Sequence, residues 1–459
     1  MRLTATRAVA AATALALGLS ACGGSSDSGT SSAAAGGGSK TIKVAYQTTA
    51  TFDQMQTLME TAKTEFEAAN AGTTVELVPI QGEGPDYYTK LALMNQSAST
   101  APDVQYEDTF KIQADAAAGY LLPLDDKLAG WSDWSLFAEG AKAAGLGADG
   151  KTYGVSLGTD TRGLWYNQDI LKAAGVTVPW EPKTWQDVLD AAAKVKETQP
   201  DVIPMNVYSG KAAGEAASMQ GFEMLLYGTQ DTLYNAETAK WITGSQGFKD
   251  SLTFIQNLYQ NGLGPTPEQA LDPNIFTNVT SEWLPKGQLA IALDGSWQSG
   301  AWIEGGTAPW AEWSTVMANA PMPTQNGEAP GLTSMSGGWT LAVGAKTQNA
   351  DAAFGFLTTA LNKKNSQSFA IDNSQIAVRS DVAEDPAYTS ANPSFAFFSS
   401  LVPDTNFRPA TEDYGQISNA IQVAMEAVMT GSSSVDEAAA EYDSAVVGIV
   451  GEDKTEAAK

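Results

Sequence analysis

Patterns typical of β-strands and of amphipathic helices alternate along almost the whole chain. Segment 41–49, TIKVAYQTT, alternates apolar and polar side chains as a half-buried strand does. Segment 52–72 then places its apolar residues at helical spacing and ends in Ala-Gly. A second strand, a second helix and a third strand follow over 73–108, and similar units continue to residue 450. This alternation predicts an α/β fold with parallel sheets.

The chain has no histidine and only one cysteine, Cys22. It can therefore form neither a Ser-His-Asp nor a Cys-His nucleophile, and most zinc sites are excluded. Only metal sites built from oxygen ligands remain open. No GxxxxGK[ST] phosphate loop occurs, so the chain does not bind ATP by that device. We therefore expect no catalytic residues of these two nucleophile types, no cofactor and no metal site.

The first 39 residues predict an export signal followed by a tether. Arg2 and Arg7 precede an apolar stretch over 8–19 that is too short to span a bilayer. The tetrad at 19–22, LSAC, resembles the bacterial lipobox, in which the cysteine is acylated and becomes the first mature residue. We expect a signal peptide over 1–21, lipidation of Cys22 with fatty acyl chains such as palmitate, and a flexible Gly/Ser tether over 22–39. A plain secretion signal with an incidental cysteine is the alternative.

Length and charge limit the remaining choices. Residues 40–459 exceed what one hydrophobic core usually supports, so two domains are expected. The chain has 52 acidic and 26 basic residues, a formal net charge of −26. Such a surface repels nucleic acid and anionic lipid, so we expect no nucleic-acid partner and membrane contact only through the lipid anchor.

Five stretches, in order, resemble the extracellular solute-binding proteins of ABC importers, family 1, which includes maltose- and oligosaccharide-binding proteins. The resemblance runs from about Lys40 to the end of the chain. Its motifs are PDV with GYLLPL at 102–124, DGKTYG with WYNQD at 149–169, P…TW at 179–185, KGQLA with GSW at 286–297, and GWTLAV at 338–343.

The resemblance implies a two-lobed periplasmic-binding-protein-like fold of type II, with the ligand in a cleft at the hinge. It places the first lobe at 40–157 plus 338–376 and the second at 158–337 plus 377–459. Hinge closure around a ligand is the motion known for such lobes.

The resemblance also implies the function. We expect a substrate-binding lipoprotein that captures a carbohydrate, a di- or oligosaccharide, outside the cell. It would deliver the sugar to the transmembrane permease subunits of an ABC importer, with ATP hydrolysed by a separate cytoplasmic subunit. We expect a monomer on the outer face of the cell membrane, and the alanine-rich composition and the lipobox suit a Gram-positive cell.

A sugar presents an apolar face that stacks on aromatic rings and a rim of hydroxyls that bonds to carboxylates, amides and guanidinium groups. Trp297 follows a strand and a Gly-Ser turn, at the edge where α/β sheets bind ligands, and Trp339 follows Gly337 and Gly338. We expect both indoles to stack on the ligand. Packing in the core is the alternative for each.

Polar candidates lie at strand ends and at two of the few arginines. Glu107 and Asp108 end the third strand and Gln47 follows the first, so their side chains are expected at the cleft. The expected mature chain holds only Arg162, Arg379 and Arg408. Arg379 and Arg408 are assigned to the ligand because a guanidinium grips vicinal hydroxyls or a carboxylate; structural salt bridges are the alternative.

Three other functions stay open at this stage, one of which is a surface adhesin or sensor partner without a closable cleft. Carboxylates beside aromatic platforms also build glycoside hydrolases, whose two acids need a defined separation. The same binding fold could take a non-sugar ligand, namely a polyamine, a metal ion or an organic solute, and the acidity would suit a polyamine. The sequence does not name the sugar, its linkage or its length.

Overall fold

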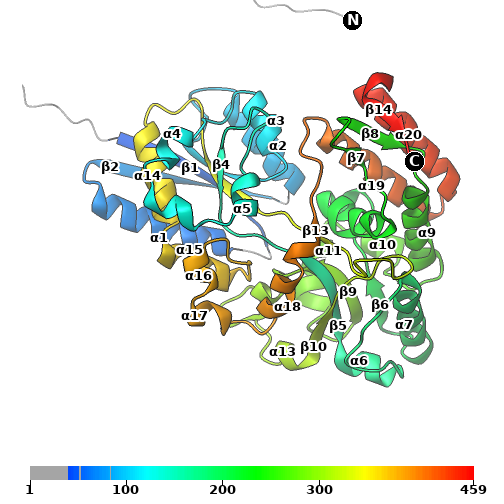
Figure 1. Cartoon of the computed structure of the whole chain (residues 1–459). Helices are drawn as coiled ribbons and strands as arrows, with labels where there is room; N and C mark the ends of the chain where they lie inside the picture. Colours follow the sequence, from blue (N-terminus) through cyan, green and yellow to red (C-terminus); the bar gives the residue numbers. More distant parts are fainter. Residues whose placement is uncertain (1–39, 51–52, 83, 459) are drawn as a thin grey trace, which may run out of the picture. The chain divides into compact units, whose positions relative to one another are not determined.

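The computed structural model describes residues 40–50, 53–82 and 84–458. The signal peptide, Cys22 and the tether lie outside these residues. The described chain is built on two large sheets, each with its own hydrophobic core (Figure 1). We call the part around the sheet β2-β1-β3-β12-β4 the N-lobe and the part around the sheet β10-β5-β9-β6 the C-lobe.

The N-lobe sheet combines parallel and antiparallel strands. Its members are β1 (Lys40–Thr48), β2 (Thr73–Gln81), β3 (Val104–Asp108), β4 (Gly154–Ser156) and β12 (Trp339–Val343). β1 runs parallel to β2 and β3, whereas β12 lies between β3 and β4 and is antiparallel to both. β12 comes much later in the sequence than the other four strands, so this sheet is complete only after the chain has returned to the N-lobe.

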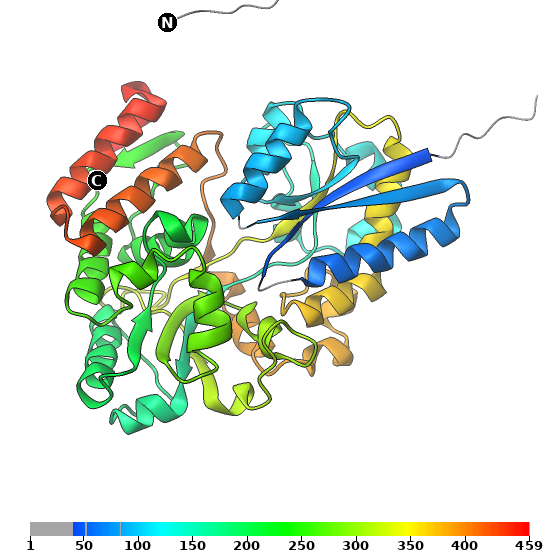
Figure 2. The same ribbon diagram turned by 180° about the vertical axis from the view of Figure 1, so that it is seen from behind.

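Helices cover the N-lobe sheet. They are α1 (Gln54–Ala69), α2 (Gly84–Asn95), α3 (Ile112–Ala117), α4 (Asp125–Leu128), α5 (Glu139–Ala143), α14 (Ala350–Ala360) and α15 (Lys363–Asp372), with the 3₁₀ turn η1 (Ser132–Leu136). α1 buries its apolar stripe, in which Phe66 meets Phe356 of α14 edge-on at 5.8 Å. Figure 2 shows α1 in blue beside α15 in gold, a pairing of helices that are remote in sequence.

The C-lobe sheet is almost completely buried. It contains β5 (Arg162–Asn167), β6 (Ile203–Asn206), β9 (Leu289–Gly295) and β10 (Met317–Ala320). Every residue of β5 and β9 is buried. β5 is antiparallel to β9 and β10, and β6 is parallel to β9. Both large sheets are therefore mixed, whereas the sequence predicted parallel sheets. The strands that run opposite to their neighbours are β5 and β12, and the chain enters each of them after it has crossed from one lobe to the other.

The remaining elements complete the C-lobe and the junction. The helices are α6 (Gln168–Ala173), α7 (Trp185–Thr198), α8 (Met224–Leu226), α9 (Gln246–Gln260), α10 (Pro267–Ala270), α11 (Ile275–Thr277), α12 (Gln298–Trp302), α13 (Trp313–Val316), α16 (Ser380–Ala383), α17 (Pro386–Thr389), α18 (Phe395–Ser400), α19 (Tyr414–Thr430) and α20 (Val435–Val450). Two small sheets pair β11 (Ser334–Met335) with β13 (Thr405–Asn406), and β14 (Thr455–Ala457) with β8 (Lys240–Thr243) and β7 (Tyr234–Asn235). The 3₁₀ turns are η2 (Lys211–Ala213), η4 (Tyr227–Thr229), η6 (Val402–Asp404) and η7 (Glu452–Lys454).

Segment 214–228 has apolar residues at helical spacing but is not a regular α-helix. Its middle is the π-helix η3 (Ala217–Glu223), and a second π-helix, η5, covers Asn278–Trp283. π-turns are rare, and they occur frequently at functional sites. Residues beside η3 line the cleft described below.

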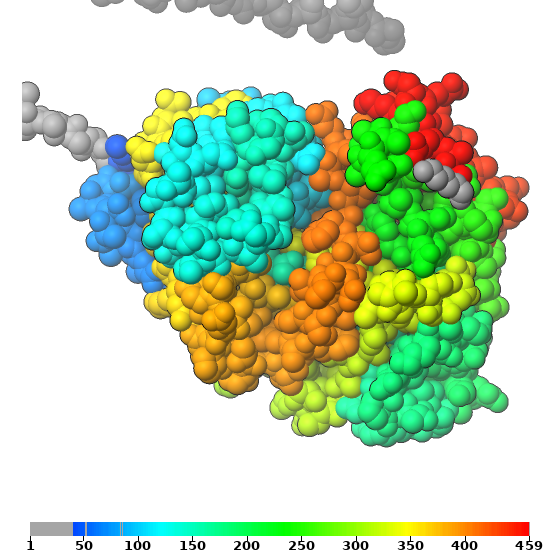
Figure 3. All heavy atoms as spheres, in the orientation of Figure 1, coloured from blue at the N-terminus to red at the C-terminus, as the bar shows by residue number. Residues whose placement is uncertain are grey.

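The chain changes sheet between β4 and β5 and again between β10 and β12, and it then returns to helices packed on the C-lobe. On the face drawn in Figure 3, orange atoms of segment 380–410 cover the junction between the two lobes. The residue limits predicted for the two lobes stay a prediction.

Candidate functional site

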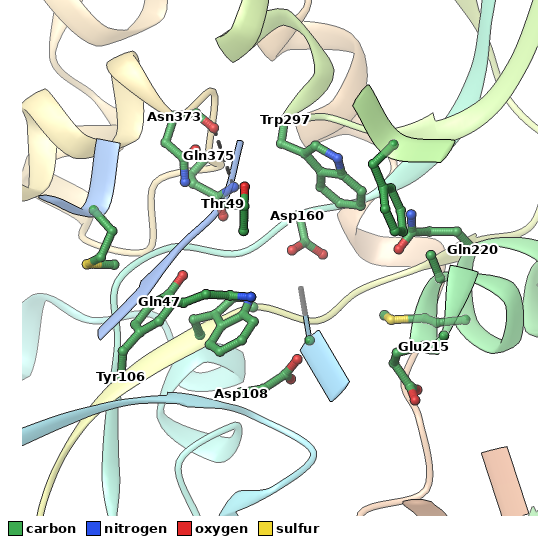
Figure 4. A pocket seen from close by; sticks show the side chains of 18 of the residues that line it. Gln47, Thr49, Tyr106, Asp108, Asp160, Glu215, Gln220, Trp297, Asn373 and Gln375 are labelled. Carbon is green, nitrogen blue, oxygen red and sulfur yellow. Dashed lines mark hydrogen bonds between the residues drawn. The ribbon is translucent and has the colours of Figure 1, made fainter. Parts of the chain in front are cut away.

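A cleft of about 250 Å³ lies between elements of both lobes. Its N-lobe lining comes from the ends of β1, β3 and β12, the start of α1 and the turn after α15. Its C-lobe lining comes from the start of β5, the segment around η3, the turn after β9 and the loop after β13. Figure 4 shows Trp297, Asp160, Asp108 and Glu215 around one open space. Five of the predicted site residues line it: Gln47, Asp108, Trp297, Trp339 and Arg408.

Trp297 takes its place from a glycine at the end of β9. A Cβ at Gly295 would lie 2.0 Å from the indole ring, so only glycine leaves room for Trp297 in this position. Gly295 is paired with Arg162 in the sheet register, and the Arg162 guanidinium lies over the Trp297 ring at 4.6 Å from the centroid. This cation–π contact stiffens the indole at the cleft wall.

Trp339 reaches the cleft opposite Asp108 in the register of β12 and β3. Tyr106 stacks on its indole with centroids 4.3 Å apart and planes at 9°, and Tyr88 lies near parallel to it at 6.0 Å. The face covered by Tyr106 is not available to a ligand. Trp339 can therefore stack on a ligand, as predicted, only through the part of its indole that Tyr106 does not cover.

Arg408 joins the two lobes at the floor of the cleft. Its Nη2 donates to Asp108 Oδ1 at 2.7 Å, and its Nη1 donates to Glu215 Oε1 at 3.4 Å. The guanidinium also lies over the Phe110 ring at 4.3 Å. Burial alone would lower the pKa of Arg408, but the carboxylates of Asp108 and Glu215 outweigh it and raise that pKa well above its usual range.

A second buried ion pair lies beneath Trp297. Arg162 Nη1 donates to Asp160 Oδ1 and to the Met335 carbonyl at 3.2 Å. Asp160 Oδ1 also accepts from the backbone N–H of Gly337 at 3.0 Å. Burial lowers the pKa of Arg162, partly offset by Asp160, and the guanidinium remains charged.

A hydrogen-bonded chain of acids extends from the cleft into the C-lobe. Tyr414 Oη lies 2.6 Å from Glu215 Oε1 and 2.6 Å from Glu223 Oε1. Burial raises the pKa of Glu223 to about 8, although its bond with Tyr414 lowers it in part. Because one hydroxyl carries a single proton, we infer that Tyr414 donates to Glu215 and accepts from protonated Glu223 at neutral pH.

Amide side chains complete the cleft. Gln47 Nε2 donates to the Gly82 carbonyl at 2.8 Å, and Gln54 Nε2 donates at 3.4 Å to the Gly300 carbonyl of α12 in the C-lobe. Gln54 Oε1 is buried without a hydrogen-bond partner among the described residues. Buried acceptors are normally satisfied, so this atom marks a position where a ligand or water would donate.

The cleft also holds Asn373 and Gln375, which flank a strained residue. Ser374 between them has φ of 46°. Its hydroxyl lies 2.9 Å from Asn392 Nδ2 and 3.1 Å from the hydroxyl of Ser299 in α12, and all three side chains are buried. This polar cluster holds the turn against the C-lobe.

Glu107 lies on the other side of the sheet. Successive side chains of a strand point to opposite faces, so Tyr106 and Asp108 face the cleft while Glu107 does not. Glu107 is 1% exposed and accepts from Gln105 Nε2 at 2.8 Å. Burial, and then the nearby Asp115, raise the pKa of Glu107 well above its usual range.

Arg379 is also absent from the cleft lining. Its guanidinium is 2% exposed on the side chain and forms ion pairs with Asp381 at 2.9 Å and Asp133 at 3.0 Å. Its Nη1 donates to the Leu361 carbonyl at 2.8 Å. These contacts occupy all three nitrogen atoms and fix the junction after α15, which is the structural salt bridge weighed as the alternative for Arg379.

Several cleft residues were not assigned from the sequence. They are Thr49, Gln54, Met55, Tyr88, Tyr106, Asp160, Glu215, Gln220, Phe276, Asn373 and Gln375, besides Arg162, which was noted only for its rarity. Tyr106 could have been found, since it is two residues from Asp108 in one strand. Glu215 and Gln220 could not, because their positions depend on η3.

The other tryptophans near Trp297 pack in the C-lobe core. Trp165 lies 5.3 Å from Trp302 and 6.2 Å from Trp313, with the ring planes strongly inclined. Among the described residues there is no group of three or more His, Cys, Asp or Glu side chains arranged to hold a metal ion. No helix in the described part of the chain is long and apolar enough to cross a membrane.

Comparison with known proteins agrees with this architecture. The maltodextrin-binding protein MdxE of Bacillus subtilis is 25% identical over 378 residues, which cover 80% of this chain and 79% of MdxE. Among solved structures, the GacH receptor of Streptomyces glaucescens GLA.O, determined unliganded and with acarbose, aligns with a TM-score of 0.76 at 23% identity. That alignment covers 90% of this chain and 99% of GacH. Maltose-bound MalE3 of T. maritima aligns with a TM-score of 0.75 at 18% identity, over 89% of this chain and 100% of MalE3.

These solved structures share the two-lobed fold, and their identities are too low to carry more than the fold. The model of the bacterial extracellular solute-binding protein family matches residues 61–396. This match spans both sheets apart from β1, most of the cleft lining and the crossings near residues 160 and 338. The chain therefore belongs to the bacterial extracellular solute-binding protein family.

Proposed function

We propose that this protein captures a di- or oligosaccharide outside the cell and delivers it to the permease of an ABC importer. The observation that carries the proposal is the cleft, where the Trp297 indole lies above carboxylates and amides from both lobes. An aromatic wall facing planar polar groups matches the two chemical faces of a sugar. The maltodextrin-binding relative supports the same ligand class.

In this mechanism the ligand bridges the lobes. Trp297 covers the apolar face of one sugar ring, and Asp160, Gln47 and Gln54 bond to hydroxyls. Asp108, held by Arg408, lies at the junction, so a ligand that contacts it senses both lobes. Closure presents both lobes to the permease, and a separate cytoplasmic subunit hydrolyses ATP. The protein binds its ligand without chemical change and works as a monomer.

A thermal-shift screen of residues 40–459 tests the proposal. The panel contains mono-, di- and oligosaccharides, together with spermidine, divalent metal ions and organic acids. A ligand at 100 times its Kd stabilises the folded state by about 2.7 kcal/mol, which raises Tm measurably. We expect one class of di- or oligosaccharide to raise Tm. A shift with spermidine or a metal ion and with no sugar would contradict the proposal, as would hydrolysis of the bound sugar.

The anchor is a separate part of the proposal. The LSAC tetrad supports acylation of Cys22, with segment 22–39 as the tether to the outer face of the membrane. Expression of the full chain in a Gram-positive host with labelled palmitate should label the wild type and leave Cys22→Ala unlabelled. Equal labelling of both proteins would contradict the anchor.

A further inference from the structure

We propose that the cleft selects its saccharide by charge, accepting neutral sugars and sugars with an ammonium substituent while rejecting those with a carboxylate. Asp160 is the residue that determines this selectivity. The inference rests on the proposed function, because it names the chemical class that the same cleft would take.

The positive charges of the cleft are already paired. In the described part of the cleft lining there are two guanidinium groups, Arg162 and Arg408, and no lysine. Both side chains are buried, and each is already bonded to a carboxylate of the cleft. An anionic sugar would have to displace one of these carboxylates to find a cation. Displacement leaves a buried carboxylate unpaired, which is strongly unfavourable.

The negative charges of the cleft outnumber its positive charges. Among the described residues, three carboxylates line the cleft, Asp108, Asp160 and Glu215, one more than the two guanidinium groups. The site therefore carries an excess of negative charge in surroundings that screen it poorly. The whole chain, at −26, adds repulsion of the same sign for an approaching anion.

The three carboxylates of the cleft are not equally hydrogen-bonded. Both oxygens of Asp108 accept hydrogen bonds, Oδ1 from Arg408 and Oδ2 from Tyr88 at 2.9 Å. Both oxygens of Glu215 do so as well, Oε1 from Tyr414 and Oε2 from Ser418 at 2.8 Å. Asp160 differs, because the hydrogen bonds found among the described residues use only its Oδ1.

The position of Asp160 makes its second oxygen important. Figure 4 shows the carboxylate at the same open space that the Trp297 ring borders, and because Arg162 covers one face of that indole, a sugar would stack on its other face. Gln54, whose buried Oε1 has no hydrogen-bond partner within the described part of the chain, lines the same cleft. Both groups are hydrogen-bond acceptors, so they need a ligand that donates. Hydroxyl and ammonium groups supply such donors, and a carboxylate does not.

The test uses matched sugars that differ only at C6. For maltose, cellobiose, lactose and mannobiose, the series carries CH₂OH, CH₂NH₃⁺, COO⁻ or the uncharged amide CONH₂ at this carbon of either ring. Calorimetry on residues 40–459 at pH 7 gives Kd for each. We expect the carboxylate to bind at least about tenfold more weakly than the isosteric amide, and the ammonium sugar at least as tightly as its parent.

Asp160→Asn then tests the assigned residue. This variant removes the free carboxylate oxygen and also releases Arg162 from its partner. We expect the preference for the amide over the carboxylate to shrink by about tenfold or to reverse. The control is Asp126→Asn, an exposed position on α4 that changes the net charge equally and should leave the ratio unchanged.

The outcomes separate this inference from the proposed function. If parent sugars bind and the carboxylates bind as well as the amides, charge selection is wrong and sugar binding stands. If the ratio is large but is unchanged in Asp160→Asn, the assignment to Asp160 is wrong. If no member of any series binds, both the sugar assignment and this inference fail.

Discussion

Trp297 and Arg379 illustrate how neighbours decide what a residue does. Both were expected to bind the ligand. Trp297 lies in the cleft because Gly295 leaves space for its ring and Arg162 covers one face. Arg379 instead has every nitrogen atom occupied by Asp381, Asp133 or the Leu361 carbonyl. A guanidinium that is bonded at every nitrogen atom and lies outside the cleft lining stabilises the fold and does not contact the sugar.

Trp297→Ala should weaken sugar binding about 10- to 100-fold, because burying one aromatic side chain against a ligand contributes ~1.5–3 kcal/mol. Calorimetry with the sugar found in the screen measures the loss. Trp297→Phe is the matched variant and should retain most of the affinity. Unchanged binding in Trp297→Ala, with Tm close to that of the wild type, would show that the ligand lies elsewhere.

Arg379→Ala should behave in the opposite way. Removing one partner of a buried ion pair costs ~3–5 kcal/mol, and because Asp133 and Asp381 are partly exposed we expect about 2–3 kcal/mol of lost stability. Urea unfolding measures this loss, and Kd for the sugar should change by less than about twofold. A large loss of affinity with unchanged stability would restore the ligand-binding role that the sequence suggested.

At the scale of elements, the alternating patterns predicted most helices and strands near the positions found, including β1, α1, β3, β9, α9 and α19. The direction of β5 and β12 could not be predicted, because it depends on which lobe the chain has just left. The position of Glu107 is a smaller difference between the prediction and the structure. The two-residue period of β3 allows only one of Glu107 and Asp108 to face the cleft, and the pattern alone does not say which.

The π-helix η3 was beyond prediction for a different reason. Helical periodicity over 214–228 was visible, but the wider turn depends on tertiary contacts. Gly221 shows one of them, because a Cβ there would lie 2.3 Å from the Tyr208 carbonyl. The wider turn places Glu223 in the core, within reach of Tyr414, and Gln220 at the cleft.

The Glu223 pKa, about 8 against 4.5 for an ordinary glutamate, makes stability depend on pH. Between these values the folded state holds a proton that the unfolded state has released. The free energy of unfolding should therefore fall as pH rises from about 4.5 to 8, by on the order of 1.4 kcal/mol per unit of pKa difference. Asp294, whose pKa burial raises to about 6, contributes in the same direction at lower pH.

Glu223→Gln isolates this contribution. The variant should show a flatter profile than the wild type in urea unfolding at pH 5.5, 6.5, 7.5 and 8.5, and it should be the more stable protein at pH 8.5. Glu237→Gln, at an exposed position, serves as the control and should follow the wild type. Parallel curves for Glu223→Gln and wild type would mean that Glu223 is ionised throughout this range.

At the scale of the whole molecule, the N-lobe sheet is not made from a continuous stretch of chain, whereas the four strands of the C-lobe sheet all lie within 162–320. β12 lies between β3 and β4 and is the partner that holds β4 in the N-lobe sheet. Residues 40–157 alone should therefore stay unfolded, while 40–157 joined by a short linker to 338–376 should fold. Circular dichroism and urea unfolding distinguish these two versions of the N-lobe. Cooperative unfolding of the shorter piece would contradict this account, and failure of the longer one would overturn the predicted boundaries.

The position of β12 has a consequence for the journey across the membrane. A polypeptide threaded outward from its amino end delivers residues 339–343 only after about three-quarters of its length has crossed. Until then the N-lobe lacks an inner strand, and the C-lobe still awaits α19, α20 and β14. We therefore expect the N-lobe sheet to be completed only late in export, after β12 has crossed.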